Sequence, residues 1–328
     1  MPGFCSSSDS YLDSGKIMSA VRVCAIDVGT NSVRGLVAEV DEHGQVRVLH
    51  REGNITRLGE GLSQTGVLDE QAIERTARAV EKIAAQARSL SAARYGVIAT
   101  SAARNAINSA KLKDRIRELT SLETEVITGQ EEARYVCEGV LRSLELAGET
   151  ALLADIGGGS TELVFAPRAG REPLLTFVEI GCVGITELFL HHDPPREEEL
   201  SRAIEHATRL LRNAASELPA GANELIGLGG TITTIPAILL RMAKYDGSRV
   251  HNFVLTREHV ESVLHRLASM GLEKRKNVVG LERGRADIIV GGIVVLKALL
   301  AATGFQKLRV SDRGILVGVA LSLWRREG

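Results

Sequence analysis

One short phrase occurs twice in this chain in nearly the same form. Asp27-Val28-Gly29-Thr30-Asn31-Ser32 recurs as Asp155-Ile156-Gly157-Gly158-Gly159-Ser160, 128 positions later (155 minus 27). Apolar, strand-like segments precede and follow each copy, at 21–26 and 33–40 and again at 151–154 and 163–166. Each copy is therefore predicted to be a β-hairpin. The repeat restricts the chain to folds built from two related halves.

The turn of each hairpin carries an acid, then glycines or small residues, then a hydroxyl. Glycine lets backbone N–H groups approach an anion, the hydroxyl adds a donor, and an Asp at the strand end can hold a divalent cation. Two such turns facing each other would clamp a phosphate chain. With a formal net charge of −1, the whole molecule does not attract a polyanion, so local Arg, helix N-termini or a metal must hold it.

The length of 328 residues predicts two domains of roughly 130 to 170 residues, in agreement with the duplicated hairpin. Strands at 21–27, 33–40 and 46–51 precede a helix at 69–90 with Asp69 as its N-cap, a strand at 95–99 and a helix at 109–119. This βββαβα order is typical of a ribonuclease-H-like half of a double-domain α/β architecture.

The second half follows the same plan. We predict a helix at 131–143, a hairpin at 151–166, strands at 174–180 and near 226–228, and a helix from about 194 to 218. The apolar segment 288–302 is predicted to be a buried helix that covers a core or pairs with a partner chain. A strand near 308–310 and a final helix to about residue 324 close the chain.

Seven ordered blocks resemble those of the Ppx/GppA family of exopolyphosphatases and guanosine-pentaphosphate phosphohydrolases, from about residue 21 to 319. The blocks are 27–32, 99–106 (Ala-Thr-Ser-Ala-Ala-Arg-Asn-Ala), 128–134 (Thr-Gly-Gln-Glu-Glu-Ala-Arg), 155–162, 229–231 (Gly-Gly-Thr), 285–287 (Arg-Ala-Asp) and 311–312 (Ser-Asp). The resemblance implies two ribonuclease-H-like domains of the actin, heat-shock chaperone and sugar-kinase superfamily with a cleft between them. We expect domain I at 21–128 plus about 305–328, domain II at 129–304, and a disordered tail at 1–20, with Met18 a plausible true start.

The resemblance also implies roles for individual residues. Glu132 resembles the family's catalytic carboxylate, which activates a water for in-line attack on the terminal phosphorus, and Asp155 and Glu162 resemble the acids that complete the catalytic set. Mg²⁺ is the expected cofactor, held by Asp155, Glu162 and Asp27. Phosphate is expected at Thr30, Asn31, Ser32, Arg104, Gly157, Gly158, Gly159, Ser160 and Thr161. A nucleotide or distal phosphate is expected at Gly229, Gly230 and Thr231.

The neighbouring Glu131 has a competing role as an acid in the first turn of a helix. The basic segment 274–276 is read as a solvated face that could also attract a polyphosphate tail. His192-Asp193 is read as a coincidental dipeptide.

The preferred function is Mg²⁺-dependent hydrolysis of the terminal phosphoanhydride of inorganic polyphosphate, and the alternative is 5'-phosphohydrolysis of guanosine pentaphosphate (pppGpp). A small-molecule kinase or a non-catalytic alarmone sensor of the same superfamily is a further rival. We expect no nucleic-acid partner and no membrane partner, and a homodimer is considered. Four scattered cysteines without C-x-x-C spacing favour reduced thiols and a cytoplasmic location.

Overall fold

The computed structural model describes residues 20–168 and 172–326. The expected N-terminal tail and its alternative start at Met18 therefore lie outside the described residues. Within them, no helix is long and apolar enough to cross a membrane.

The first sheet has the order β3-β2-β1-β4-β5, with β1–β3 antiparallel and β4 and β5 added in parallel. Its strands are β1 (Val21–Val28), β2 (Ser32–Val40), β3 (Val46–Ile55), β4 (Arg94–Ala99) and β5 (Thr124–Val126). The helices of this half are α1 (Leu62–Thr65), α2 (Glu70–Ser89), α3 (Ser101–Asn105) and α4 (Ser109–Thr120). Asp69 caps α2 by accepting from the Ala72 amide at 3.0 Å, which explains why the helix begins there.

The second sheet repeats this order as β8-β7-β6-β9-β11 and adds β10 at the far edge. Its strands are β6 (Thr150–Ile156), β7 (Thr161–Pro167), β8 (Leu174–Val178), β9 (Glu224–Leu228), β10 (Val254–Thr256) and β11 (Lys307–Val310). Its helices are α6 (Cys182–Phe189), α7 (Glu197–Ser216), α8 (Gly230–Leu239), α9 (Gly247–Val250), α10 (Arg257–Ala268), α11 (Leu272–Arg275) and α12 (Ile289–Thr303). Two sheets with one strand order confirm the predicted ribonuclease-H-like duplication.

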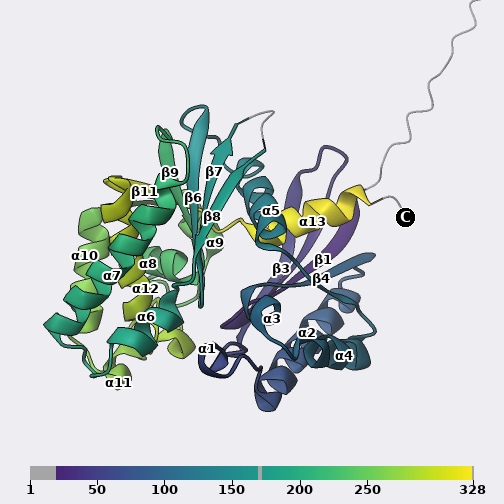
Figure 1. The fold of residues 1–328 in the computed structure, drawn as a ribbon. Helices are drawn as coiled ribbons and strands as arrows, with labels where there is room; N and C mark the ends of the chain where they lie inside the picture. The colour runs from purple at the N-terminus through teal and green to yellow at the C-terminus, as the bar shows by residue number, and fades with distance from the viewer. Residues whose placement is uncertain (1–19, 169–171, 327–328) are drawn as a thin grey trace, which may run out of the picture.

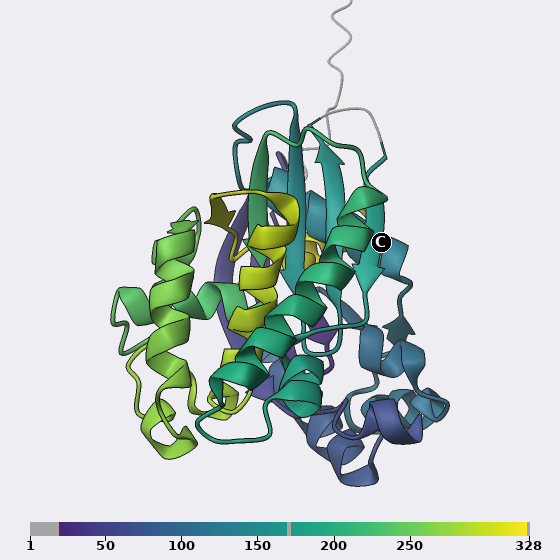
Figure 2. The same cartoon turned by 60° about the vertical axis from the view of Figure 1, so that its left-hand side comes forward.

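Two helices, α5 (Gly129–Leu141) and α13 (Ile315–Arg325), lie between the sheets (Figure 1). Alternate residues of β1 separate the cores: Val23 and Ala25 face α5 and α13, whereas Cys24 and Ile26 face α2. The same alternation in β6 sends Leu153 to the central core and Leu152 to the core of the second domain. Figure 2 shows α7, α10 and α12 over the outer face of the second sheet.

Three expectations can now be resolved by packing. The segment 288–302 is the core helix α12, and most of its apolar side chains are buried against α6, α7 and α10. The helix therefore covers the core of the second domain and does not present an apolar face to a partner chain. Arg275 of the basic segment is buried and donates to Asp193 at 2.6 Å, so both residues are structural. The two elements of the C-terminal segment belong to different sheets. Strand β11 pairs in parallel with β9 in the second sheet, whereas helix α13 packs on strands of the first sheet. Membership of the first domain therefore resumes after β11, later than the expected residue 305.

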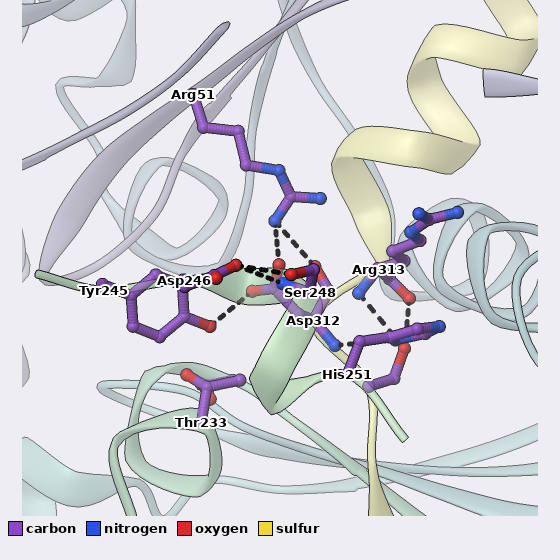
Figure 3. A network of polar contacts seen from close by, with 10 residues as sticks. Arg51, Thr233, Tyr245, Asp246, Ser248, His251, Asp312 and Arg313 are labelled. Carbon is purple, nitrogen blue, oxygen red and sulfur yellow. Dashed lines mark hydrogen bonds and ion pairs between the residues drawn. The ribbon is translucent and has the colours of Figure 1, made fainter. Parts of the chain in front are cut away.

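A polar network joins the two halves where the chain passes from β11 to α13 (Figure 3). Arg51 of β3 donates to the Asp312 backbone oxygen at 3.0 Å and forms an ion pair with its carboxylate. The Tyr245 hydroxyl donates to the other carboxylate oxygen of Asp312 at 2.7 Å. Asp312 thus links the first sheet to the segment before α9 of the second domain.

Candidate active site

The two repeated turns have the same backbone geometry and face each other. In the first, the Gly29 amide donates to the Ser32 carbonyl at 3.1 Å, and in the second the Gly157 amide donates to the Ser160 carbonyl at 2.9 Å. A Cβ atom placed on Gly158 would lie 3.3 Å from the Cβ of Thr30, which shows how closely the turns approach. One interdomain cavity therefore has a glycine-rich turn from each domain in its wall.

The hairpin register places a second charged residue opposite the acid in each copy. Asp27 pairs with Arg34 across β1 and β2, and Asp155 pairs with Glu162 across β6 and β7. Directly opposed residues of an antiparallel pair project from the same face of the sheet. The first hairpin thus presents a balanced ion pair, with Arg34 Nη2 at 2.6 Å from Asp27 Oδ2, whereas the second presents two acids.

Glu132 reaches the cavity because of the way α5 begins. Thr128 caps the helix, and Glu131 closes the capping box by accepting from the Thr128 amide at 2.7 Å. Glu132 is left to line the cavity with Asp155 and Glu162. Arg104 Nη1 holds it in place, donating to Glu132 Oε2 at 3.1 Å and to the Ile127 carbonyl at 2.9 Å.

Burial keeps these carboxyl groups from ionising easily. It raises the pKa of Glu132, with the Asp27 carboxylate adding to the effect and Arg104 opposing it. Burial also raises the pKa of Glu162, helped by Glu132 and Asp155, even though the Ser160 hydroxyl donates to Glu162 at 2.6 Å. The pKa of Asp155 is raised by burial as well, with Arg34 opposing. Carboxyl groups with raised pKa values in a cleft are the usual signature of acid–base chemistry.

The start of α8 forms another wall of the cavity. Gly229 has φ of 92°, and a Cβ atom there would lie 2.5 Å from the Ile156 oxygen and 2.7 Å from Asp155 Oδ1. Only glycine fits so close to the acid-bearing strand. Arg285 lies against Gly230, and its Nε donates to Glu282 at 2.9 Å. The N-terminus of α8 and this guanidinium are therefore donors on the same side of the cavity.

The structure gathers most of the sequence-predicted residues around this cavity. Its lining includes Asp27, Thr30, Asn31, Ser32, Glu132, Asp155, Gly157, Gly158, Ser160, Glu162, Gly229, Gly230 and Thr231.

Three of the phosphate residues predicted from sequence lie elsewhere. The Thr161 side chain is fully buried and donates to the Ile180 carbonyl, because Thr161 precedes Glu162 on one strand and so projects from the opposite face. Gly159 lies beside Thr30 and Ser101, outside the cavity lining. Arg104 reaches the cavity only through Glu132.

Sequence reasoning missed other cavity residues: Arg34, Thr100, Ser101, Cys182 and Arg285. Arg34 had a detectable signal, because it stands seven residues after Asp27 just as Glu162 stands seven after Asp155. Arg285 belongs to a motif block that had been given no role. Cys182 comes from the start of α6, whose backbone donates to the Gly157 carbonyl at 3.0 Å, a long-range contact without a local pattern.

The acids suit a metal that is shared with water and substrate. Within residues 20–168 and 172–326, no group of three or more His, Cys, Asp or Glu side chains is close enough to enclose an ion. Asp27 Oδ1 is nevertheless buried without a protein partner and can accept the ion, whereas the equally unpartnered Asn31 Nδ2 is an amide donor that suits a phosphate oxygen. Mg²⁺ is usually held by one or two carboxylates plus waters and substrate phosphates, so this donor set fits it.

Fold and site together define a two-domain α/β protein of the ribonuclease-H-like kind, with an acidic, glycine-rich cleft between its domains. The family model described as the Ppx/GppA phosphatase family matches residues 36–327. The chain belongs to this family, which confirms the resemblance seen in the sequence.

Similar proteins cover nearly the whole chain. "Exopolyphosphatase 2" of Mycobacterium tuberculosis is 37% identical over 93% of this chain and 99% of its own length. The crystal structure of the Aquifex aeolicus Ppx/GppA family member is 33% identical, with a TM-score of 0.77 over 94% of this chain and all of that chain (100%). An exopolyphosphatase from Cytophaga hutchinsonii is 25% identical, with a TM-score of 0.82 over 92% and 97% of the two chains.

Proposed function

We propose that this chain is a Mg²⁺-dependent exopolyphosphatase that removes the terminal phosphate of inorganic polyphosphate. The observation that carries the proposal is the convergence of Glu132, Asp155 and Glu162 on a cavity walled by two glycine-rich turns. The name of the Mycobacterium tuberculosis relative supports the choice of substrate.

In this proposal the two turns bind the terminal phosphate through backbone N–H groups and the Thr30, Ser32 and Asn31 side chains. Arg34 and Arg285 neutralise its charge through their planar guanidinium groups. The substrate lies between the domains, where the surrounding walls exclude all but the attacking water.

Glu132 acts as the general base. Since Arg104 holds Oε2, we assign the attacking water to Oε1, which accepts its proton as the oxygen approaches the phosphorus in line. Burial assists, because it raises the proton affinity of the Glu132 carboxylate. One or two of the carboxylates of Asp27, Asp155 and Glu162, together with water and substrate oxygens, would hold Mg²⁺, which when bound would spread the charge that develops on the transferred phosphoryl oxygens.

Guanosine pentaphosphate is the second candidate substrate. It is favoured by the extension of the cavity to the N-terminus of α8, where Gly229–Thr231 and Arg285 could bind a second phosphate group or a nucleotide. We also propose a cytoplasmic enzyme, supported by the free, buried thiols of Cys24, Cys137 and Cys182.

A paired assay tests this assignment. Phosphate release is measured from polyphosphate and from guanosine pentaphosphate at equal concentrations, each with Mg²⁺ and with the metal removed by a chelator. We expect faster release from polyphosphate and loss of both activities on chelation, with recovery when Mg²⁺ is restored. Consumption of the nucleotide alone would replace the preferred substrate by the second candidate, and full activity in chelator would remove the metal from the mechanism.

A further inference from the structure

A second cavity, of about 280 Å³, opens beside the catalytic cavity, between α3 of the first domain and β8 of the second. Its wall includes Arg104 and Asn105 on one side and Leu175, Phe177 and Glu179 on the other. The catalytic cavity and this one have Ser101, Ser160 and Glu162 in common. The second cavity therefore adjoins the reaction site at these three residues, and its own opening, called here the second mouth, lies between α3 and β8.

The wall from β8 is unsuited to a long polyanion. Strand alternation turns Leu175, Phe177 and Glu179 toward the cavity, while Thr176 and Val178 are buried on the other face. Phe177 is 58% exposed. This wall offers apolar surface and a carboxylate but no anion-binding turn, whereas the catalytic cavity combines its acids with two arginines and the two repeated turns. The substrate chain is therefore better held in the catalytic cavity.

Arg104 is the one cation among the described residues of the second cavity, and it stands at the inner end. Its Nη1 is bound to Glu132 and to the Ile127 carbonyl. Within the described residues, the other N–H groups of this guanidinium donate to no protein acceptor. A single small anion that leaves the terminal-phosphate site past Glu132 would meet these donors before it reaches the less attractive wall from β8.

We propose that the cavity between α3 and β8 binds the released orthophosphate and conducts it out of the site, while the shortened chain stays in the catalytic cavity. The inference rests on the proposed hydrolysis of a phosphate chain. It has a kinetic consequence: the product leaves without displacing the remaining substrate, so successive cleavages need no new encounter.

The test uses a substitution that narrows the second mouth, and it measures bond cleavage and phosphate release separately. Asn105→Trp adds bulk at an exposed position of that mouth, and Ile107→Trp, at a side chain 83% exposed and outside both cavities, is the matched control. Excess enzyme is mixed with polyphosphate; bond cleavage is followed by acid quench and free phosphate by a fluorescent phosphate-binding protein. In Asn105→Trp we expect cleavage at the wild-type rate with free phosphate lagging by about tenfold, and no lag in the control.

A second variant tests the binding of phosphate without narrowing the mouth. Phe177→Lys places a cation on the outer wall, and the exposure of Phe177 makes the substitution tolerable to the fold. Inhibition by added orthophosphate should then strengthen by about two- to fivefold, the range expected for an exposed ion pair.

Superimposed cleavage and release traces in Asn105→Trp would overturn the proposal, as would unchanged inhibition in Phe177→Lys. A slower capture of polyphosphate by Asn105→Trp with no lag would overturn it too, because the mouth would then admit substrate. These outcomes differ from failure of the proposed function, in which the wild-type protein itself cleaves neither substrate.

Discussion

At the scale of single residues, the same hairpin register gives a different pair of charges in each domain. In the first domain it places Arg34 opposite Asp27 and gives an ion pair, and in the second it places Glu162 opposite Asp155 and gives a surplus of negative charge. The negative charge of Asp155, Glu162 and Glu132 must be neutralised in this buried site, either by protonation or by a bound cation. Residue type and motif order predicted the acids and Arg104 from sequence, whereas Arg34 and Arg285 were recognised as cavity residues only in the structure, through the hairpin register and the contacts with α8.

The pH dependence of turnover follows from the environment of Glu132. Burial, then Asp27, raises the pKa of Glu132 to about 7. This pKa belongs to the protein without bound metal, so it is measured by NMR titration of Glu132 in the metal-free enzyme, with Glu132→Gln to assign the signal. Mg²⁺ bound by the neighbouring acids would offset the carboxylate charges that help to raise the pKa, so kcat at saturating Mg²⁺ should level off at a lower pH than the metal-free titration. A metal-free pKa near 4.5, the ordinary value for a glutamate, would contradict the assigned environment of the base.

The same raised pKa predicts a stability effect with a definite sign. The folded-state pKa exceeds the unfolded one, so ionised Glu132 costs stability, and the cost appears as pH rises from about 4.5 to about 7. Glu132→Gln should therefore be more stable than the wild type at pH 8, by about 1–3 kcal/mol, and equal to it below pH 4.5.

Glu131→Gln is the matched control for this stability measurement. Hydrogen bonds from the Thr128 amide and hydroxyl lower the pKa of Glu131, so loss of its charge should destabilise the protein instead. The free energy of unfolding of both variants is measured with denaturant at pH 8. Changes of the same sign relative to the wild type would contradict the account.

At the scale of elements, local patterns predicted what local interactions determine. The antiparallel hairpins and α2 follow period-two and helical spacing, and both were correct within a few residues. The five-residue helix α3 lies between the predicted strand at 95–99 and the predicted helix at 109–119, where the sequence indicated no element, because so short a helix is held by tertiary contacts. The pairing of β11 with β9 joins segments about 80 residues apart, and no local pattern carries that information.

The turn before α8 gives a prediction at this scale. Gly229→Ala would combine a φ of 92° with contacts of 2.5 Å to the Ile156 oxygen and 2.7 Å to Asp155, so it should move the acid and abolish most activity. Gly221→Ala is the control, because Gly221 has a φ of 88° with open space around its Cβ position. It should lose about 1 kcal/mol of stability and keep its activity. The rate of polyphosphate hydrolysis is measured for both folded variants. Equal rates in Gly229→Ala and Gly221→Ala would contradict the prediction.

At the scale of the whole molecule, the two domains are tied at the passage from β11 to α13. Arg51 and Tyr245 approach Asp312 from different domains, and all three are remote in sequence (Figure 3). Together with the Arg57–Asp287 ion pair and the packing of α5 on α13, this tie holds the two repeated turns facing each other. The duplicated motif in the sequence predicted that the turns would meet, but not what holds the domains in place.

Arg51→Ala should weaken this tie. Because the Arg51–Asp312 ion pair is partly buried and Asp312 would also lose its partner, Arg51→Ala should lower the free energy of unfolding by about 1–3 kcal/mol. Arg47→Ala is the control on the same strand, since Arg47 is exposed and pairs with Glu39 inside the first sheet. It should change stability by less than about 1 kcal/mol. The free energy of unfolding of both variants is measured in urea. An equal loss in the two would show that the interdomain ion pair contributes no more to stability than an exposed pair within one sheet.

The most direct test of the central claim is the turnover of Glu132→Gln measured together with its binding of polyphosphate. The substitution keeps the shape and a hydrogen-bond acceptor for Arg104 but removes the base. We predict that kcat falls by about 10² to 10⁴ while the Kd for polyphosphate stays close to the wild-type value. Unchanged turnover, or a loss explained entirely by weaker binding, would contradict the assignment of Glu132 as the base in the interdomain cleft.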